Sequence, residues 1–399
     1  MFRFVPPAGS PVKVGQVLGA LRVSLQPGKG EEKALSEVRD RLRVRFAFGI
    51  SSGRAALCLV LKALASLRPG RRVVAVPAYT CFTVAAAIVR AGHTIHPVDI
   101  DPATLDYDFD RLESVPEDGL LCILTSNLFG FVNDLARTRG IARKKRAFVV
   151  DDAAQAFGAT RNGHMSGTGG DVGIFSLGRG KALPAIEGGL IVTDSVEIAE
   201  AIQAGLAQVS GASKTHLAWV FLQMVVYSIF LRPRLYWIPN AMPFLKLGST
   251  EFSPDFRITG LPALSSGLLT QLIESPVDAS AIRRANAARI SKVLSTKSAF
   301  SSPKPATDCL PTYVRFPVLA RNRTMRDQVV AKLRAVGIGA GPFYPTALCD
   351  IPGIDQYMAP RDYHRPNAEQ VSQSLFTLPT HHYLGKADLD RVVEVLSSF

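Results

Sequence analysis

The chain has 399 residues, 47% of them apolar and 20% charged, which is the composition of a globular protein with a sizeable core. This composition excludes a disordered chain, a collagen-like repeat and a small disulfide-held scaffold. Lysine and arginine (46) outnumber aspartate and glutamate (33), so the formal net charge is +13. The surplus favours an anionic partner, whether a phosphate-bearing metabolite, a membrane surface or a nucleic acid.

The cysteine usage points to a reducing compartment. The five cysteines are widely scattered, without a CxxC pair or a histidine at ligand spacing, so we expect free thiols and no metal site. The opening residues MFRFVPP lack the basic segment, apolar run and cleavage site of a secretory signal. We therefore expect a cytoplasmic protein.

Strands and helices alternate along much of the chain. Residues 1–45 form a lead-in segment with a charged, helix-like stretch at 30–39. Apolar runs typical of strands follow at 47–50, 72–77, 94–99, 120–125, 147–152, 172–176 and 189–193, with helical segments between them. This alternation predicts an α/β fold, with a mainly parallel sheet in a large domain at 46–290. Residues 291–399 predict a smaller α+β domain, built on a strand at 313–318 and helices at 325–336 and 387–398.

The first candidate site is the turn between the strand at 47–50 and the helix that follows it. Such a turn directs free backbone N–H groups toward the carboxyl edge of the sheet, where phosphates commonly bind. Ser52, Gly53, Arg54 and Ala55 are therefore candidate phosphate ligands. Serine and glycine also occur at such turns as helix caps alone, so the turn by itself leaves both interpretations open.

Two further candidates follow later strands. Asp151 and Asp152 end an apolar strand, which places a carboxylate at the same sheet edge as a ligand or as a helix cap. Lys181 lies in a glycine-rich loop, where burial favours the neutral amine that forms Schiff bases, although most single lysines are solvated. Together the turn, the acid and the lysine match the needs of pyridoxal 5'-phosphate (PLP): an anion cup, a partner for the pyridine nitrogen and an amine for the aldehyde.

These stretches resemble the DegT/DnrJ/StrS family of PLP-dependent sugar aminotransferases of fold type I. The resemblance is specific from about 48 to 193 and fainter from 313 onward. Residues 52–57 (SGRAAL) resemble the family's S-G-T-A-A-L turn, and residues 151–159 (DDAAQAFGA) resemble E-D-A-A-Q-A-H-G-A. The F-S pair at 175–176, the lysine at 181 and the E-G-G at 187–189 keep the family's spacing.

The resemblance implies a role for each matching residue. Asp152 would partner the pyridine nitrogen, and Gln155 would donate a hydrogen bond to the cofactor, at its ring oxygen. Ser176 would bind the phosphate with the turn at 52–55, and Lys181 would form the Schiff base. The resemblance thus implies Lys181 and Asp152 as the catalytic residues.

Three departures from the family pattern predict an unusual substrate or a divergent dimer contact. Cys81, next to Phe82, occupies the position at which relatives carry an aromatic that stacks on the cofactor ring. Asn127 replaces the usual histidine before L-Y-G. The N-Y-R stretch, with which the partner subunit completes the site, has no clear counterpart near residues 256–259.

The resemblance implies a homodimeric aminotransferase. It would carry an amino group from an amino acid, glutamate or glutamine, to a keto sugar on a nucleotide or a lipid, in polysaccharide or glycolipid biosynthesis. A related dehydratase branch has histidine in place of the lysine, so Lys181 argues against that activity. The alternative is a non-catalytic, PLP-binding regulator. Nucleic-acid binding rests on charge alone and is not expected, because no motif supports it.

One apolar segment has no place in the family pattern. Residues 217–231 would span about 22 Å as a helix, against about 30 Å of bilayer hydrocarbon. Basic and aromatic residues follow as far as position 246, a combination that settles at membrane interfaces. The sequence leaves two interpretations of segment 217–246 open: association with the cytoplasmic membrane face, and a helix buried in the core or in a dimer.

Overall fold

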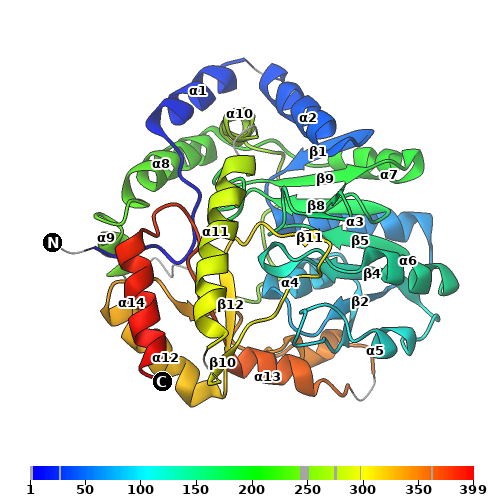
Figure 1. The fold of residues 1–399 in the computed structure, drawn as a ribbon. Coiled ribbons are helices and arrows are strands. Elements are labelled where there is room, and N and C mark those ends of the chain that lie inside the picture. The colour runs from blue at the N-terminus through cyan, green and yellow to red at the C-terminus, as the bar shows by residue number, and fades with distance from the viewer. Residues whose placement is uncertain (1–2, 27, 243–250, 274–275, 297, 361–362) are drawn as a thin grey trace.

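The computed structural model describes residues 3–26, 28–242, 251–273, 276–296, 298–360 and 363–399 (Figure 1). Its centre is a seven-stranded sheet of order β1-β9-β8-β5-β4-β2-β3. The strands are β1 (Phe46–Ile50), β2 (Val73–Pro77), β3 (Thr94–Val98), β4 (Leu120–Ser126), β5 (Phe148–Asp152), β8 (Val172–Ser176) and β9 (Gly189–Thr193). The pairs from β3 to β8 are parallel, whereas β9 is antiparallel to both β8 and β1. The predicted α/β fold with a mainly parallel sheet is confirmed.

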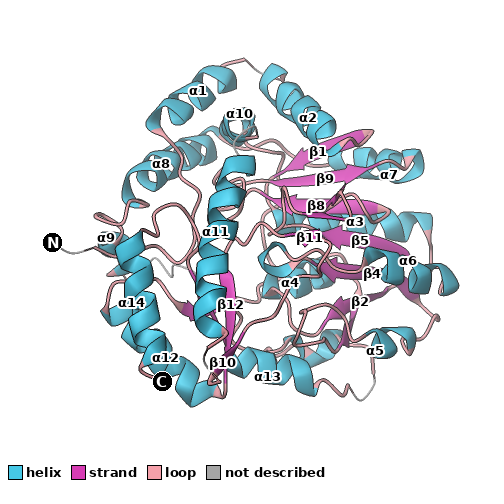
Figure 2. Ribbon diagram, viewed as in Figure 1, coloured by secondary structure: helices cyan, strands magenta, loops and turns pink. Residues whose placement is uncertain are grey.

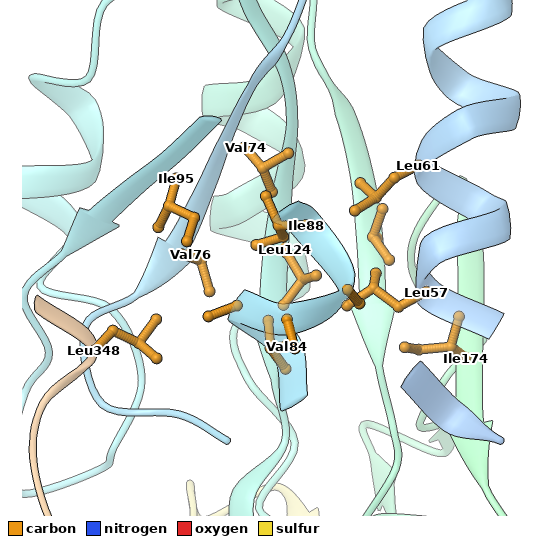
Figure 3. Close-up of a cluster of buried hydrophobic side chains, with 14 of the residues drawn as sticks. Leu57, Leu61, Val74, Val76, Val84, Ile88, Ile95, Leu124, Ile174 and Leu348 are labelled. Carbon is orange, nitrogen blue, oxygen red and sulfur yellow. The ribbon is translucent and has the colours of Figure 1, made fainter. Parts of the chain in front are cut away.

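Helices cover both faces of this sheet (Figure 2). They include α3 (Gly53–Leu67), α4 (Phe82–Arg90), α5 (Phe109–Glu113), α6 (Leu135–Lys144) and α7 (Val196–Leu206). Because successive strand residues point to opposite faces, Val74 and Val76 pack with α3 and α4 whereas Ala75 packs with α6. Figure 3 shows the first of these clusters, in which Leu57 and Leu61 of α3 lie beside β4 and β8. All seven residues of β4 are buried, as a strand covered on both faces requires.

A second, antiparallel sheet has the order β10-β12-β14-β13. Its strands are β10 (Phe300–Ser301), β12 (Phe316–Ala320), β13 (Gly341–Pro342) and β14 (Leu375–Leu378). The helices of this part are α11 (Pro276–Leu294), α12 (Arg323–Ala335), α13 (Pro366–Ser374) and α14 (Lys386–Ser397). The predicted smaller α+β unit is therefore present. The domain boundaries stay predictions, and the one at 290/291 falls inside α11.

The lead-in segment forms two helices, α1 (Val14–Ser24) and α2 (Lys29–Leu42). The sequence pattern predicted α2 but not α1, which packs along α10 (Ala263–Leu272). Ahead of α1, Val5 forms a parallel bridge with Ile338 and is fully buried. The N-terminal residues therefore lie against the C-terminal part of the fold. The remaining strands β6 (Thr160–Arg161), β7 (His164–Met165) and β11 (Cys309–Leu310) form a small third sheet.

The apolar segment forms α8 (Lys214–Phe230) and leads into the short α9 (Trp237–Asn240). Val220 and Met224 of α8 are buried, and the helix packs against α1 and α10. Trp219 and Leu222 remain 55% and 50% exposed. Within the described ranges, no helix combines the length and the hydrophobicity needed to cross a bilayer. Residues 243–246 of the predicted segment lie outside the described residues.

Candidate active site

A cavity of about 270 Å³ opens at the carboxyl edge of the central sheet, and eight of the nine predicted site residues line it. They are Ser52, Gly53, Arg54, Cys81, Asp152, Gln155, Ser176 and Lys181. Ala55 is the exception. It is fully buried at the start of α3, and its backbone N–H donates to Ser52 Oγ over 3.2 Å. Ser52 thus caps α3, as one interpretation of the turn requires, and it also lines the cavity, where phosphate binding stays a prediction.

Gly53 and Ser176 form one end of the cavity. A Cβ atom on Gly53 would lie only 2.9 Å from the Ser176 Cβ, so the close approach of the turn to β8 requires glycine. Ser176 Oγ accepts a 3.4 Å hydrogen bond from the Gly178 N–H. The start of a helix, a serine hydroxyl and bare glycine backbone therefore meet at this end, which suits a phosphate.

Arg54 adds a positive charge at the same end. Its guanidinium lies 4.7 Å from the ring centre of Phe256, a cation–π contact that holds the side chain in place. Burial lowers the pKa of Arg54, whereas guanidinium groups in proteins as a rule stay charged at neutral pH. Among the described residues no carboxylate lies within ion-pair distance of this guanidinium, which leaves it able to bind an anion.

Asp152 and Asp151 have different surroundings although they are neighbours on β5. Asp152 lines the cavity, and its Oδ1 accepts a 2.9 Å hydrogen bond from the Ala154 N–H. Burial raises the pKa of Asp152 to about 6, and the positive charge of Lys181 opposes this rise. Asp151 is fully buried and accepts hydrogen bonds from the Gly167 N–H (2.8 Å) and Asn127 Nδ2 (2.6 Å). Asp152 is therefore the carboxylate that a ligand can reach.

Lys181 lies in the loop between β8 and β9. Burial lowers the pKa of its amine, while Cys81 and Asp152 act in the opposite direction. Lys181 and Asp152 line the same cavity, so a single ligand can contact both. A larger neutral fraction makes the Lys181 amine a better nucleophile than a solvated lysine.

Gln155 connects the cavity to a residue that the sequence analysis missed. Its Oε1 accepts a 3.1 Å hydrogen bond from the Phe129 N–H, and its Nε2 donates to the Tyr344 hydroxyl over 3.1 Å. Tyr344 follows β13 and is 3% exposed. It lines the cavity together with Cys81. Paired aromatics at 343–344 after a glycine-containing turn are a signal in the sequence that points to this position.

Two of the three departures from the family pattern, Cys81 and Asn127, line the cavity. Cys81 precedes α4, and its Sγ lies 3.0 Å from Thr83 Oγ1, while the aromatic residue Tyr344 lines the same cavity. Asn127 uses Nδ2 to bind Asp151 and the Asp152 carbonyl, while its Oδ1 accepts from the Asn133 N–H. Asn127 thus braces the strand end that carries Asp152.

Comparison with known proteins agrees with this geometry. Residues 14–397 match the model of the DegT/DnrJ/EryC1/StrS aminotransferase family. A GDP-perosamine synthase of Caulobacter vibrioides is 28% identical over 368 residues, covering 92% of this chain and 88% of that protein. A pleiotropic regulatory protein of Geobacillus stearothermophilus is 25% identical with the same coverage of both chains. The solved structure of Helicobacter pylori PseC, an aminotransferase of pseudoaminic acid biosynthesis, superposes with a TM-score of 0.80 at 15% identity, covering 99% of this chain and 98% of that chain. The family match spans nearly the whole chain, and this protein therefore belongs to the DegT/DnrJ/EryC1/StrS aminotransferase family.

Proposed function

We propose that this protein is a PLP-dependent aminotransferase that transfers an amino group from an amino acid to a keto sugar. The observation that carries the proposal is the meeting of Gly53, Ser176, Asp152 and Lys181 at one cavity. These residues fit the cofactor: a narrow cup with Arg54 beside it suits a phosphate, and a buried carboxylate suits a pyridinium. When bound, PLP supplies an electron sink that stabilises negative charge on a substrate carbon.

The residues of this chain would then divide the work. The phosphate would be bound by Ser52, Gly53, Arg54 and Ser176. Gln155 would orient the cofactor ring through a hydrogen bond to the ring oxygen. Asp152 keeps the ring nitrogen protonated, because a carboxylate with a pKa near 6 is ionised at neutral pH. Lys181 Nζ holds the aldehyde between turnovers. During turnover this nitrogen would move a proton from the amine-bearing carbon of the donor to the cofactor carbon that bore the aldehyde, acting first as base and then as acid.

The proposed substrates follow from the relatives. The amino donor is glutamate or glutamine, and the acceptor is a keto sugar carried on a nucleotide or a lipid, in the biosynthesis of cell-surface polysaccharide or glycolipid. A similar protein, the Caulobacter enzyme, is a GDP-perosamine synthase. The net charge of +13 suits an acceptor that carries phosphate.

A non-catalytic regulator is the second candidate, because a relative of similar coverage is a pleiotropic regulatory protein. One experiment separates the two. The protein is loaded with PLP, reduced with borohydride and mapped by peptide mass spectrometry, and a second sample is followed by visible absorbance after glutamate or glutamine is added. An adduct on Lys181 with a donor-dependent change of absorbance supports the aminotransferase. An adduct without any change supports the regulator, and an adduct elsewhere refutes the site.

We also propose that the protein is a cytoplasmic homodimer that associates with the membrane surface through α8. Trp219, Leu222 and Val226 lie on one exposed face of this helix, and Arg232 and Arg234 follow it at exposed positions. An apolar stripe that ends in basic residues suits an anionic lipid surface. Light scattering of the purified protein tests the dimer, and co-sedimentation with vesicles tests the lipid.

A further inference from the structure

A second cavity, of about 340 Å³, borders the loop that carries Lys181. It shares no lining residue with the candidate active site. Ala182, Leu183 and Pro184 of the loop form one wall. The other walls come from the segment before α1 together with Gln16 of α1, from Leu272 of α10 and the following α11, and from His381 and His382. Four segments far apart in the sequence therefore meet around this space.

The polar centre of this cavity is Arg283 of α11, which is only 2% exposed. Its Nη2 donates to Ser10 Oγ over 2.5 Å and to the Gly9 carbonyl over 3.4 Å. A guanidinium has five N–H groups, and the described residues offer no acceptor to its Nη1 or Nε. No described carboxylate lies within ion-pair distance of Arg283 either. A buried cation without an acid is costly, so the arrangement leaves room for an anion.

Lys13 adds a positive charge at the exposed mouth of the cavity, and the lining residues that the structure describes include no aspartate or glutamate. His381 adds no charge to this lining, because burial lowers the pKa of its imidazole to about 3, and its Nε2 donates to the Pro6 carbonyl over 2.8 Å. Burial lowers the pKa of Arg283 to about 10, so the guanidinium keeps its charge at neutral pH.

We propose that this cavity binds a small oxyanion, a carboxylate or a phosphate, against Arg283. The oxyanion would accept hydrogen bonds from the N–H groups of Arg283 that do not bond Ser10 or Gly9, in the paired geometry that guanidinium groups favour. The site is separate from the cofactor and would be filled by a molecule other than PLP.

The position of the cavity couples such a ligand to the active site through hydrogen bonds. Ser10 Oγ lies 3.1 Å from the Lys181 carbonyl and 3.2 Å from the Ala182 carbonyl. The hydroxyl therefore stands between Arg283 and the backbone of Lys181. An anion that binds the guanidinium competes with the hydrogen bond from Arg283 to Ser10. This changes the strength of the hydrogen bonds that Ser10 donates to the Lys181 and Ala182 carbonyls. The bound anion thereby regulates the placement of the Lys181 amine.

The test uses the PLP-loaded enzyme, so that the phosphate cup at Ser52 and Ser176 is already filled. Inorganic phosphate and succinate are titrated separately at an ionic strength held constant with sodium chloride, and the melting temperature is recorded. We expect a saturable rise with at least one of them in the wild type, and the identity of the effective anion tells phosphate from carboxylate. Arg283→Gln should weaken the apparent affinity by about tenfold or more.

Arg284→Gln is the matched control. It removes the neighbouring arginine, whose bond to the Pro311 carbonyl is 3.4 Å long and which borders a different cavity. This variant should respond to the anion as the wild type does. The proposal is overturned if the wild type shows no rise beyond that in chloride, or if Arg283→Gln keeps the full response.

A second variant covers the case in which Arg283→Gln does not fold. Lys13→Gln changes an exposed side chain at the mouth, and its loss should weaken anion binding by about two- to fivefold. A binding curve for Lys13→Gln that overlays the wild type would then refute the site. The visible absorbance of the bound PLP provides a separate readout, because the effective anion should shift it in the wild type but not in Ser10→Ala.

Discussion

The side-chain amide of Gln155 donates a 3.1 Å hydrogen bond to the hydroxyl of Tyr344, which lies 189 residues further along the chain. This bond joins the edge of the central sheet to the segment that follows β13 in the smaller sheet. The Tyr344 N–H lies 3.3 Å from the Tyr79 hydroxyl, so a second bond holds the same tyrosine. Tyr344 thereby positions the amide that we assign to the cofactor's ring oxygen.

Tyr344→Phe should weaken PLP binding by about two- to tenfold, since one net hydrogen bond is worth about 0.5–1.5 kcal/mol. Tyr344→Ala should weaken it further, because an aromatic ring that lines the cavity is also lost. Quenching of protein fluorescence on titration with PLP measures both. Tyr363→Phe, a change outside this cavity, is the control. Unchanged affinity in Tyr344→Phe would show that the hydroxyl does not position Gln155.

Substitution of the two neighbouring aspartates should have different effects, on turnover for Asp152 and on stability for Asp151. Asp152→Asn should still bind PLP but lose more than about 100-fold in turnover, because an amide cannot hold the ring nitrogen protonated. Asp151→Asn should cost about 1–3 kcal/mol in the free energy of unfolding, since an amide nitrogen would face the N–H groups that Asp151 now accepts. Steady-state rates and urea unfolding of both variants provide the comparison. A silent Asp152→Asn beside an inactive, stable Asp151→Asn would reverse the assignment.

The stability of the cofactor-free protein should depend on Asp152 and on pH. Folding raises the pKa of this carboxyl from 3.8 to about 6, so its ionisation opposes folding above pH 6 and has no effect well below pH 4. Asp152→Asn should therefore stabilise the cofactor-free protein by up to about 3 kcal/mol at pH 8, with the gain vanishing toward pH 4. Urea unfolding at both pH values measures this. An equal gain at both would mean that packing, not charge, is the cause.

The exposed face of α8 should be needed for lipid binding but not for folding. Replacing Trp219 and Leu222 with serine should leave the melting temperature nearly unchanged, because both side chains are half-exposed. The variant should lose co-sedimentation with anionic vesicles. Met224→Ser, on the buried face, is the contrasting variant and should destabilise the fold. Wild-type protein that stays in the supernatant at low salt would refute membrane association. A double variant that splits the dimer would assign this face to the partner subunit.

The sequence was most informative where chemistry depends on neighbours in the chain. The turn at 52–55, the end of β5 and the loop of Lys181 each follow a strand, and parallel strands bring their carboxyl ends to one edge. For this reason the residues themselves predicted that the turn, Asp152 and Lys181 lie at one sheet edge, whereas Cys81, Gln155 and Ser176 were assigned to the site by the family resemblance. The alternation of apolar strands also predicted the sheet itself.

The parts that escaped prediction depend on contacts between distant segments. Tyr344 reaches the cavity only because the smaller sheet folds over it, and Arg283 meets Ser10 across 273 residues of sequence. The helix α1 was missed because its apolar residues pack on α10, whose sequence gives no hint of this partner. Asn127 lines the cavity, so the unusual substrate or divergent dimer contact that it indicates stays a prediction. Its hydrogen bond to Asp151, between two strand ends, could not be read from the sequence.

The order of strands has a consequence for protein synthesis. Gly53 of the first turn meets Ser176 of β8, yet β1 pairs with β9 and not with β8. The proposed phosphate site at Gly53 and Ser176 is therefore incomplete until β9 has entered the sheet between β1 and β8. During synthesis on the ribosome, residues 52–55 emerge long before β9. In that interval the nascent chain has no complete phosphate site and should not bind the cofactor. A fragment that ends before residue 189 should therefore show no affinity for PLP.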